Sequence, residues 1–290
     1  MSLDAAVLMR LEKAAARADD TLPLVELRLT ASDREFLAPE VRPIQDALER
    51  GRGFVVVERL DVPRLGKRRA TAMYWLLGQA LGEPFPQNVQ GTLLYDVTDT
   101  GRTVQEGARF SVTNAESSFH TDNSFGDRVL DWIGLLCLQP ARSGGVNQLV
   151  SGAAACEILQ RARPDVVEVL AAPFQVDRRG GIRPGETATI PVPVLSRVGP
   201  DILVRYLRFW IEAGHIRLDR PLTPVQRDAL DTFDRALSDP ALRAEFTLDQ
   251  GQILFANNRW ILHNRTAFDD DPDPEKRRHL VRLWLSKATD

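Results

Sequence analysis

The sequence predicts a mixed α+β fold in which a β-barrel core is flanked by helices. From about residue 90 onward, the chain carries many short strand-like runs at close spacing, without a helix after each run. This pattern favours an antiparallel sandwich or barrel over a doubly wound parallel sheet. The first eighty residues or so show helical patterns, and no repeat, low-complexity tract or Gly/Ser linker divides the chain. We therefore expect one domain over residues 1–290, with a helical part at about 1–85 and a barrel core with helical inserts at about 86–290.

The N-terminal part is expected to consist of helices around one strand. Residues 32–51 begin with Ser32 and Glu35 at the spacing of a capping box, and Pro39 and Pro43 are expected to kink or divide this helix. The other elements expected here are a short amphipathic helix within residues 1–20, a β-branched strand at 53–60 and a helix at 68–82.

The expected barrel strands are apolar or β-branched runs between turn residues. They lie at residues 92–97, 109–114, 132–138, 146–151, 189–195, 201–207, 252–258, 259–264 and 279–286. A helical insert is expected at residues 223–239, where Thr223 suits the N-cap and Pro224 occupies the first helical position.

Charge, apolar content and cysteine usage limit the partners and the compartment. The formal net charge of −3 leaves no basic excess for nucleic acid. No window approaches 18 uninterrupted apolar residues, so no membrane span is indicated, and the charged N-terminal stretch does not resemble a signal peptide. Cys137 and Cys156 are too few for a disulfide framework, which favours the cytoplasm. We expect a small-molecule partner, and a homo-oligomer is left open.

A histidine and a carboxylate stand two residues apart in the stretch SSFHTDNSF, at His120 and Asp122. In an extended segment residues i and i+2 point to the same side, so both side chains can reach one point inside a barrel. A bland turn or an ordinary hydrogen bond is the alternative. His263 ends an apolar run in the C-terminal part. Two neutral imidazoles and one carboxylate are the donor set of a facial triad on non-haem Fe(II), whereas a closed zinc site commonly uses four ligands, often cysteines.

Two arginines lie on one face of the last expected strand. If residues 279–286 are extended, Arg278, Leu280, Arg282 and Trp284 share that face. An arginine fork binds a carboxylate in bidentate fashion, so these side chains suit anion anchors. A solvated outer face is the alternative interpretation.

The order of these motifs resembles the TauD/TfdA branch of Fe(II)/2-oxoglutarate-dependent dioxygenases, which is close to the clavaminate synthase-like group. The similar motifs are H-x-D, SGGVNQLVSGAAA at residues 143–155, NNRWILHNR at 257–265 and RRHLVRLWL at 277–285. The resemblance implies a double-stranded β-helix, or jelly roll, as the core. It also implies Fe(II), 2-oxoglutarate as cosubstrate and dioxygen.

The resemblance assigns expected roles to single residues. The metal positions fall on His120, Asp122 and His263. Arg278 falls where the family arginine grips the distal carboxylate of 2-oxoglutarate. Arg282 falls where the taurine enzyme holds the sulfonate of its substrate, so it is expected to bind an anionic end of the substrate or to support the cosubstrate.

Two positions depart from the taurine-type pattern. Asn147 stands where those enzymes carry a threonine that helps to bind 2-oxoglutarate, and asparagine can also hydrogen-bond a carboxylate. Glu116 stands where the taurine enzyme uses an asparagine on its substrate. A carboxylate facing the pocket suggests an amine or guanidinium in the substrate, and a solvated glutamate is the alternative. With Arg282, Glu116 suggests a zwitterionic, amino-acid-like substrate.

The expected reaction is hydroxylation of a C–H bond of a small substrate, with release of succinate and CO2. Desaturation, ring closure and cleavage of a hydroxylated product would use the same residues. Two further alternatives keep these residues without oxygenase chemistry. One is a jelly-roll protein that binds a metal or a small acid without turnover, and the other is a metal-dependent hydrolase or isomerase that uses the same triad.

Overall fold

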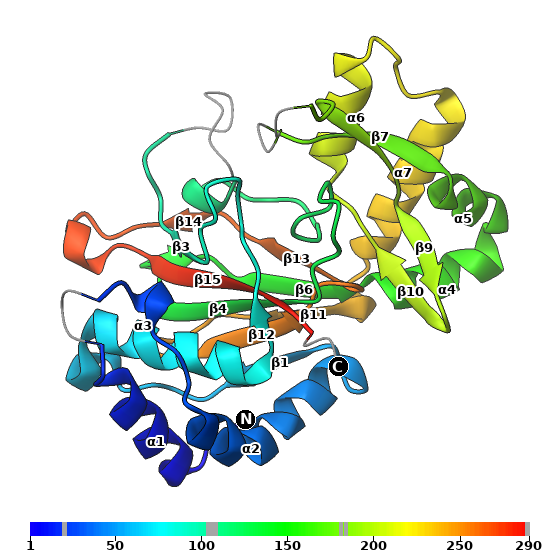
Figure 1. The fold of residues 1–290 in the computed structure, drawn as a ribbon. Helices are drawn as coiled ribbons and strands as arrows, with labels where there is room; N and C mark the ends of the chain where they lie inside the picture. The colour runs from blue at the N-terminus through cyan, green and yellow to red at the C-terminus, as the bar shows by residue number, and fades with distance from the viewer. Residues whose placement is uncertain (19–21, 103–109, 180–181, 183–184, 288–290) are drawn as a thin grey trace.

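The computed structural model describes residues 1–18, 22–102, 110–179, 182 and 185–287 (Figure 1). Its α-helices are α1 Ala5–Ala15, α2 Ala31–Glu49, α3 Val62–Leu81, α4 Gly152–Ala162, α5 Pro164–Ala171, α6 Arg208–Arg217 and α7 Pro224–Leu237. Its strands are β1 Phe54–Val57, β2 Glu83–Pro84, β3 Leu94–Val97, β4 Trp132–Gln139, β5 Ser143–Gly144, β6 Asn147–Ser151, β7 Pro173–Asp177, β8 Thr189–Pro193, β9 Leu195–Val198, β10 Asp201–Val204, β11 Arg243–Phe246, β12 Ile253–Asn257, β13 Ile261–Arg265, β14 Phe268–Asp269 and β15 His279–Ser286. Short 3-10 helices lie at Leu24–Glu26, Phe110–Val112, Pro240–Leu242 and Pro274–Lys276.

Helix α2 begins two residues earlier than the capping box expected at Ser32 suggested. Its N-cap is Thr30, whose hydroxyl accepts the backbone N–H of Asp33, while the Asp33 carboxylate accepts the N–H of Thr30. This pair, and not Ser32 with Glu35, forms the capping box, because the apolar face of the helix starts in register with Asp33. Pro39 and Pro43 lie inside one uninterrupted helix, so the expectation that they could divide it was wrong.

The largest sheet holds six strands in the order β1-β12-β4-β15-β2, and β3 also pairs with β15. Every pairing in this sheet is antiparallel. One face packs on α2 and α3, and α1 packs on these two helices (Figure 1). At the crossing of α3 and β15, a Cβ on Gly78 would lie 2.2 Å from a Leu283 methyl carbon, so a larger residue there would require the Leu283 side chain to move.

The opposite face of this sheet packs against a three-stranded sheet of order β11-β6-β13. Alternation along β15 explains how one strand serves both layers, since Val281, Leu283 and Leu285 join the core under the helices. Leu280 and Trp284 instead join a second core with Leu149 and Ile261 of the smaller sheet. The mixed α and β composition with antiparallel sheets is therefore confirmed.

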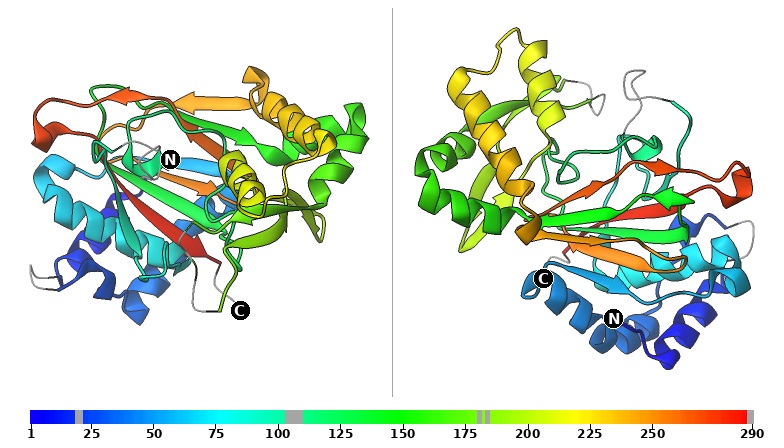
Figure 2. Two further views of the ribbon diagram at one scale, coloured as in Figure 1. Left: turned by 90° about the horizontal axis from the view of Figure 1, so that it is seen from above. Right: turned by 180° about the vertical axis from the view of Figure 1, so that it is seen from behind.

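A third group of elements lies beside one end of the two sheets, where α4 to α7 pack with β7 to β10 around their own apolar cluster (Figure 2). Expected strands 189–195 and 201–207 fall here, in two-stranded sheets away from the main layers. Residues 110–112 form a 3-10 turn where a strand was expected at 109–114. Thr223 is the N-cap of α7, as predicted, and completes a capping box with Gln226.

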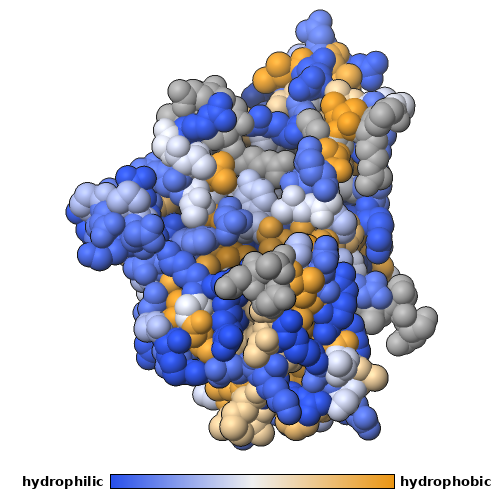
Figure 3. All heavy atoms as spheres, turned by 60° about the vertical axis from the view of Figure 1, so that its left-hand side comes forward, coloured by the Kyte–Doolittle hydropathy of each residue, from blue (hydrophilic) through white to orange (hydrophobic). Residues whose placement is uncertain are grey.

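The outer surface is largely polar on the side drawn in Figure 3, with hydrophobic residues gathered near its middle and at smaller spots. Among the described residues, no helix combines the length and the apolar character needed to cross a membrane.

Candidate active site

Backbone pairing brings the two histidines side by side. His120 forms an isolated antiparallel bridge with His263, and the two residues exchange N–H···O bonds of 3.0 and 2.9 Å. His263 lies in the middle of β13, so the H-x-D segment adds a short extension to the edge of the smaller sheet. The imidazole centroids are consequently only 4.2 Å apart.

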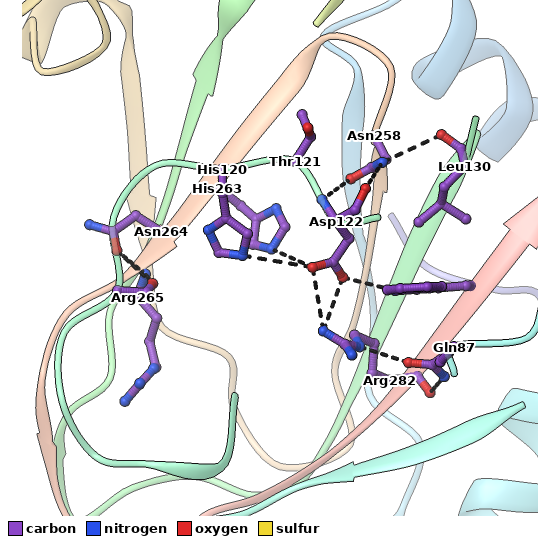
Figure 4. Close-up of polar contacts among 12 residues, drawn as sticks. Gln87, His120, Thr121, Asp122, Leu130, Asn258, His263, Asn264, Arg265 and Arg282 are labelled. Atoms are coloured by element: carbon purple, nitrogen blue, oxygen red, sulfur yellow. Dashed lines mark hydrogen bonds and ion pairs between the residues drawn. The ribbon is translucent and has the colours of Figure 1, made fainter. Parts of the chain in front are cut away.

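Asp122 is fixed through its backbone. Its N–H donates to Oδ1 of Asn258 at 2.8 Å, and Nδ2 of Asn258 donates to the carbonyls of Asp122 at 2.9 Å and Leu130 at 3.4 Å (Figure 4). One residue earlier, Thr121 exchanges two hydrogen bonds with Tyr206. These contacts hold the segment on both sides, so the direction of the Asp122 side chain is set by the fold.

The three side chains converge on one point (Figure 4). Oδ1 of Asp122 lies 3.7 Å from Nε2 of His120 and 3.9 Å from Nε2 of His263. One potential ligand atom from each residue lies within 4.8 Å of the others. Nδ1 of His120 is 2.7 Å from the carbonyl of Ser118 and therefore carries the proton, which leaves its Nε2 lone pair for a metal. Nδ1 of His263 is buried and makes no hydrogen bond with a described residue.

The site holds its donors in the protonation states that metals bind. Burial raises the pKa of Asp122, but Arg282, the two histidines and the Trp284 indole more than reverse this and bring the pKa to about 2. Burial lowers the pKa of His120, and burial together with His120 lowers the pKa of His263 to about 3. At neutral pH the cluster is therefore one carboxylate facing two neutral imidazoles.

Arg282 and Trp284 occupy the far oxygen of the Asp122 carboxylate. Oδ2 accepts the Trp284 indole N–H at 2.8 Å and the Arg282 guanidinium at 3.1 Å. Arg282 also donates to Oε1 of Gln87 at 2.8 Å. The same guanidinium nitrogen also makes a longer contact of 3.4 Å with Oδ1, which otherwise faces the two histidines. The sequence had placed Arg282 and Trp284 on one face, but it gave no local signal for Gln87 or for Asn258.

Arg278 is a buried arginine whose guanidinium forms no ion pair within hydrogen-bonding distance among the described residues, although the Asp270 carboxylate lies near enough to favour its charged form. It is 6% exposed, burial lowers its pKa to about 10, and the guanidinium lies over the Phe268 ring at 4.9 Å. Asp270 accepts the backbone N–H of Arg278, at 2.7 Å. Across the described residues, the Arg278 guanidinium forms no hydrogen bond or ion pair with any side chain or carbonyl.

Two adjoining cavities meet at His120 and Arg282. We call the first the Arg278 cavity, and its polar lining includes His120, His263, Asn147, Arg278 and Arg282. Apolar residues fill its remaining walls, namely Val97, Ile133, Leu135, Leu149 and Leu254. We call the second the Asp122 cavity, and its lining includes His120, Asp122, Ser124, Arg179, Trp210, Arg282 and Trp284.

Glu116 lies outside the lining of both cavities. It is exposed, and its Oε1 is 3.5 Å from Nδ2 of Asn264. It borders a separate hollow together with Arg208 and Arg243. The structure therefore brings together the triad, Arg278, Arg282 and Asn147, and leaves Glu116 on the neighbouring surface.

Comparison with known proteins identifies the family. Residues 23–284 match the model of the family described as "Taurine catabolism dioxygenase TauD, TfdA family". The chain belongs to this family. A uridine-5'-phosphate dioxygenase from a Streptomyces species is 30% identical over 222 residues, which cover 72% of this chain and 76% of that protein. The FR-33289 synthase of Streptomyces rubellomurinus is 26% identical over 246 residues, covering 83% and 71%.

Solved structures share the fold. An asparagine oxygenase in complex with Fe(II), 3-hydroxyasparagine and succinate superposes with a TM-score of 0.72 at 19% identity, covering 98% of this chain and 92% of that one. The non-heme iron oxygenase OrfP, in complex with Fe and alpha-ketoglutaric acid, has a TM-score of 0.70 at 19% identity, covering 99% and 93%. This TauD/TfdA member is thus an Fe(II)/2-oxoglutarate-dependent oxygenase by family.

Proposed function

We propose that this oxygenase hydroxylates a C–H bond of a small substrate, with 2-oxoglutarate and dioxygen consumed and succinate and CO2 released. One observation carries the proposal: a single cavity holds both the histidine pair and the buried Arg278 guanidinium, which forms no direct ion pair with any described residue. A desolvated charge of this kind is costly unless a ligand pairs with it.

The proposed metal ligands are His120, Asp122 and His263. Their donor set of two neutral imidazoles and one ionised carboxylate fits Fe(II) and leaves positions open for other ligands. Because Trp284 and Arg282 occupy Oδ2 of Asp122, we expect this carboxylate to bind iron through Oδ1 alone. Iron held there supplies the dioxygen chemistry of the reaction.

The proposed 2-oxoglutarate site is the Arg278 cavity. Arg278 would hold the distal carboxylate, and the Asn147 side chain, buried in the same wall, would add a hydrogen bond. The apolar walls suit the methylene groups of the cosubstrate. In the balanced reaction, one oxygen atom of dioxygen enters the substrate as a hydroxyl group and the other enters succinate.

The two sheets support a finer description of the fold. We propose that they form a double-stranded β-helix and that residues 1–290 act as one domain, since α1 to α3 share a continuous core with the six-stranded sheet.

Both cysteines are buried and free, which supports a reducing compartment such as the cytoplasm.

Small molecules are the proposed substrate class. Two similar solved structures contain hydroxylated amino acids, 3-hydroxyasparagine in one and hydroxyarginine in the other, and this supports an amino-acid-like substrate. The exposed position of Glu116 gives no added support to its role in binding an amine. The Arg282 contact with Asp122 favours a supporting role for Arg282 over direct capture of the substrate.

The test combines metal binding with turnover. Fe(II) and 2-oxoglutarate are added without oxygen, and we expect a visible charge-transfer band. Oxygen is then admitted and succinate is measured. A band without succinate across a broad substrate screen would favour a binding protein. Activity that needs neither oxygen nor 2-oxoglutarate would favour a hydrolase or isomerase.

A further inference from the structure

Polar side chains cross the outer face of the three-stranded sheet. Glu245 of β11, Gln148 of β6 and Asn264 of β13 lie directly opposite one another in the strand register. Gln148 is 9% exposed and Asn264 is 6% exposed, whereas Glu245 lies at the exposed end. Because side chains alternate along a strand, the neighbouring His263 points to the opposite side of β13, and the Asn264 side chain is directed away from its imidazole (Figure 4).

Hydrogen bonds join these side chains to the segment that carries His120. Nε2 of Gln148 donates to Oε1 of Glu245 at 2.7 Å, and Nδ2 of Asn264 donates to Oε1 of Gln148 at 2.8 Å. The hydroxyl of Ser117 then donates to Oδ1 of Asn264 at 2.8 Å. We call Ser117, Asn264, Gln148 and Glu245 the polar row.

The carboxylate at one end fixes the direction of every hydrogen bond in the polar row. An ionised carboxylate only accepts hydrogen bonds, so the Gln148 amide must present its NH2 group to Glu245 and its oxygen to Asn264. The Asn264 amide must in turn present its NH2 group to Gln148 and its oxygen to Ser117. Oε1 of Glu116, which is 3.5 Å from Nδ2 of Asn264, favours the same direction.

The segment before His120 has few backbone bonds to β13. Among the described residues, these are the two bonds of the bridge with His263 and one bond of 3.1 Å from the Ser117 N–H to the Arg265 carbonyl. Side chains add to them, since the Arg265 N–H donates to the Ser117 hydroxyl at 3.1 Å and to Oδ1 of Asn264 at 2.7 Å. The polar row therefore ends on the group that fastens this segment three residues before His120.

We propose that Ser117, Asn264, Gln148 and Glu245 are positioning residues that hold His120 opposite His263, so that an exposed carboxylate on β11 affects how tightly the triad binds iron. This inference rests on the proposed function for the identity of the metal site. A fully satisfied buried network rigidifies its surroundings and specifies one arrangement. Interrupting the polar row would leave Ser117 without an oriented acceptor and would loosen the His120 segment.

The first experiment compares the same substitution at two buried glutamines. Gln148→Leu interrupts the polar row, whereas Gln79→Leu removes a glutamine that is 5% exposed and makes two hydrogen bonds to backbone groups in the N-terminal part. Amide hydrogen exchange is measured in the metal-free full chain. In Gln148→Leu the His120 amide should exchange about tenfold faster relative to the Leu283 amide of β15, as local opening becomes easier by about one hydrogen bond. Gln79→Leu should leave this ratio unchanged.

Fe(II) affinity gives the second readout, from anaerobic titration of the metal-free full chain against a competing chelator. Gln148→Leu and Asn264→Leu should each weaken Fe(II) binding about tenfold, and Gln79→Leu should not change it. Glu245→Gln tests the far end of the polar row at an exposed position, where folding is not at risk. It should weaken Fe(II) binding about threefold, because a neutral amide no longer dictates the direction of the bonds. Glu168→Gln, at an exposed position of α5, is the control for the lost charge.

Three outcomes would overturn the inference. They are an unchanged His120 exchange ratio in Gln148→Leu, equal Fe(II) affinity in Gln148→Leu and Gln79→Leu, and equal Fe(II) affinity in Glu245→Gln and Glu168→Gln. If Gln148→Leu does not fold, Glu245→Gln decides the matter through both readouts. Failure of the proposed function is seen separately, as a wild type that binds no Fe(II), and the exchange ratio of His120 still tests the polar row.

Discussion

Two aspartates, Asp33 and Asp122, are similarly buried but have different surroundings. Asp33 lies in the N-terminal helical layer, and Asp122 lies in a cavity wall. Asp33 is 3% exposed and Asp122 is 8% exposed, and each is bound by arginine. In both cases burial raises the carboxyl pKa, and neighbouring donors more than reverse that effect.

The difference lies in what each oxygen meets. Oδ1 of Asp33 accepts Arg10 at 2.7 Å, and Oδ2 accepts Arg17 at 2.8 Å and the Thr30 N–H at 3.1 Å. Protein donors thus satisfy both oxygens of Asp33, and the group secures α1 to α2. Oδ1 of Asp122 instead faces two imidazoles at 3.7 and 3.9 Å, which are too distant for hydrogen bonds, and its one protein donor is Arg282 at the long distance of 3.4 Å.

This contrast distinguishes a carboxylate that is fully paired within the protein from the proposed metal-binding carboxylate. A carboxylate with short hydrogen bonds on both oxygens needs no further ligand. A carboxylate directed at unprotonated nitrogens has a place for a cation, and its partners on the other oxygen serve to aim it.

The first prediction concerns matched amide substitutions of the two aspartates. Asp122→Asn should lower succinate formation about a thousandfold or more, because loss of hydrogen-bonded partners of a ligand alone costs 10–100-fold. Its folding should be disturbed less than that of Asp33→Asn, since Arg282 keeps Gln87 and an amide oxygen as acceptors. Succinate assays of both variants measure the effect on turnover, and thermal unfolding measures the effect on stability. Full turnover in Asp122→Asn would remove this residue from the metal site.

The second prediction extends the comparison to arginines. Arg10 and Arg17 are paired with Asp33, whereas the Arg278 guanidinium forms no direct ion pair with a described residue. Arg278→Ala should lower the affinity for 2-oxoglutarate by about 2–5 kcal/mol, as for truncation of a buried charge pair. Anaerobic titration of the charge-transfer band gives the affinity. Unchanged affinity would move the carboxylate-binding role to Arg282.

Local patterns predicted the elements that carry the chemistry. The strand at residues 279–286 has the bounds of β15, and its alternation put Arg282 and Trp284 on one face. The i, i+2 spacing let His120 and Asp122 point to one side, and the structure adds His263 through the backbone bridge. Their role as metal ligands stays a prediction.

Long-range contacts were beyond reach of the sequence. Gln87 bonds to Arg282, 195 positions away, and Asn258 bonds to Asp122, 136 positions away. No local sequence pattern could predict either contact. The strand expected at 109–114 was also wrong, since residues 110–112 form a 3-10 turn. Among the described residues, no strand pairs with this short run.

The third prediction treats Asp33 as the structural member of the pair. Asp33→Asn should lower the free energy of unfolding by about 2 kcal/mol, through loss of charged hydrogen bonds and part of a capping box, and should leave succinate formation per folded molecule unchanged. The lowered pKa of Asp33 means that its contribution is present above the unfolded pKa of about 3.9 and is lost as pH falls. Denaturant unfolding from pH 6 to 3 should therefore show a flatter pH dependence in the variant. An unchanged slope would show that Asp33 carries no such linkage.

The last prediction tests whether aiming the carboxylate matters. Trp284→Phe keeps the aromatic packing near Phe85 and removes the N–H that donates to Oδ2 of Asp122. Arg282 then remains as the donor to that oxygen, and the carboxylate can rotate or bind through both oxygens. We expect Fe(II) affinity to fall about tenfold, at the lower end of the effect of outer hydrogen bonds to ligands, with thermal stability nearly unchanged. Tyr74→Phe is a control of similar chemistry, since it also removes one buried polar hydrogen from an aromatic side chain, away from the triad. Equal Fe(II) affinity in Trp284→Phe and wild type would mean that Arg282 alone directs Oδ1 to the metal.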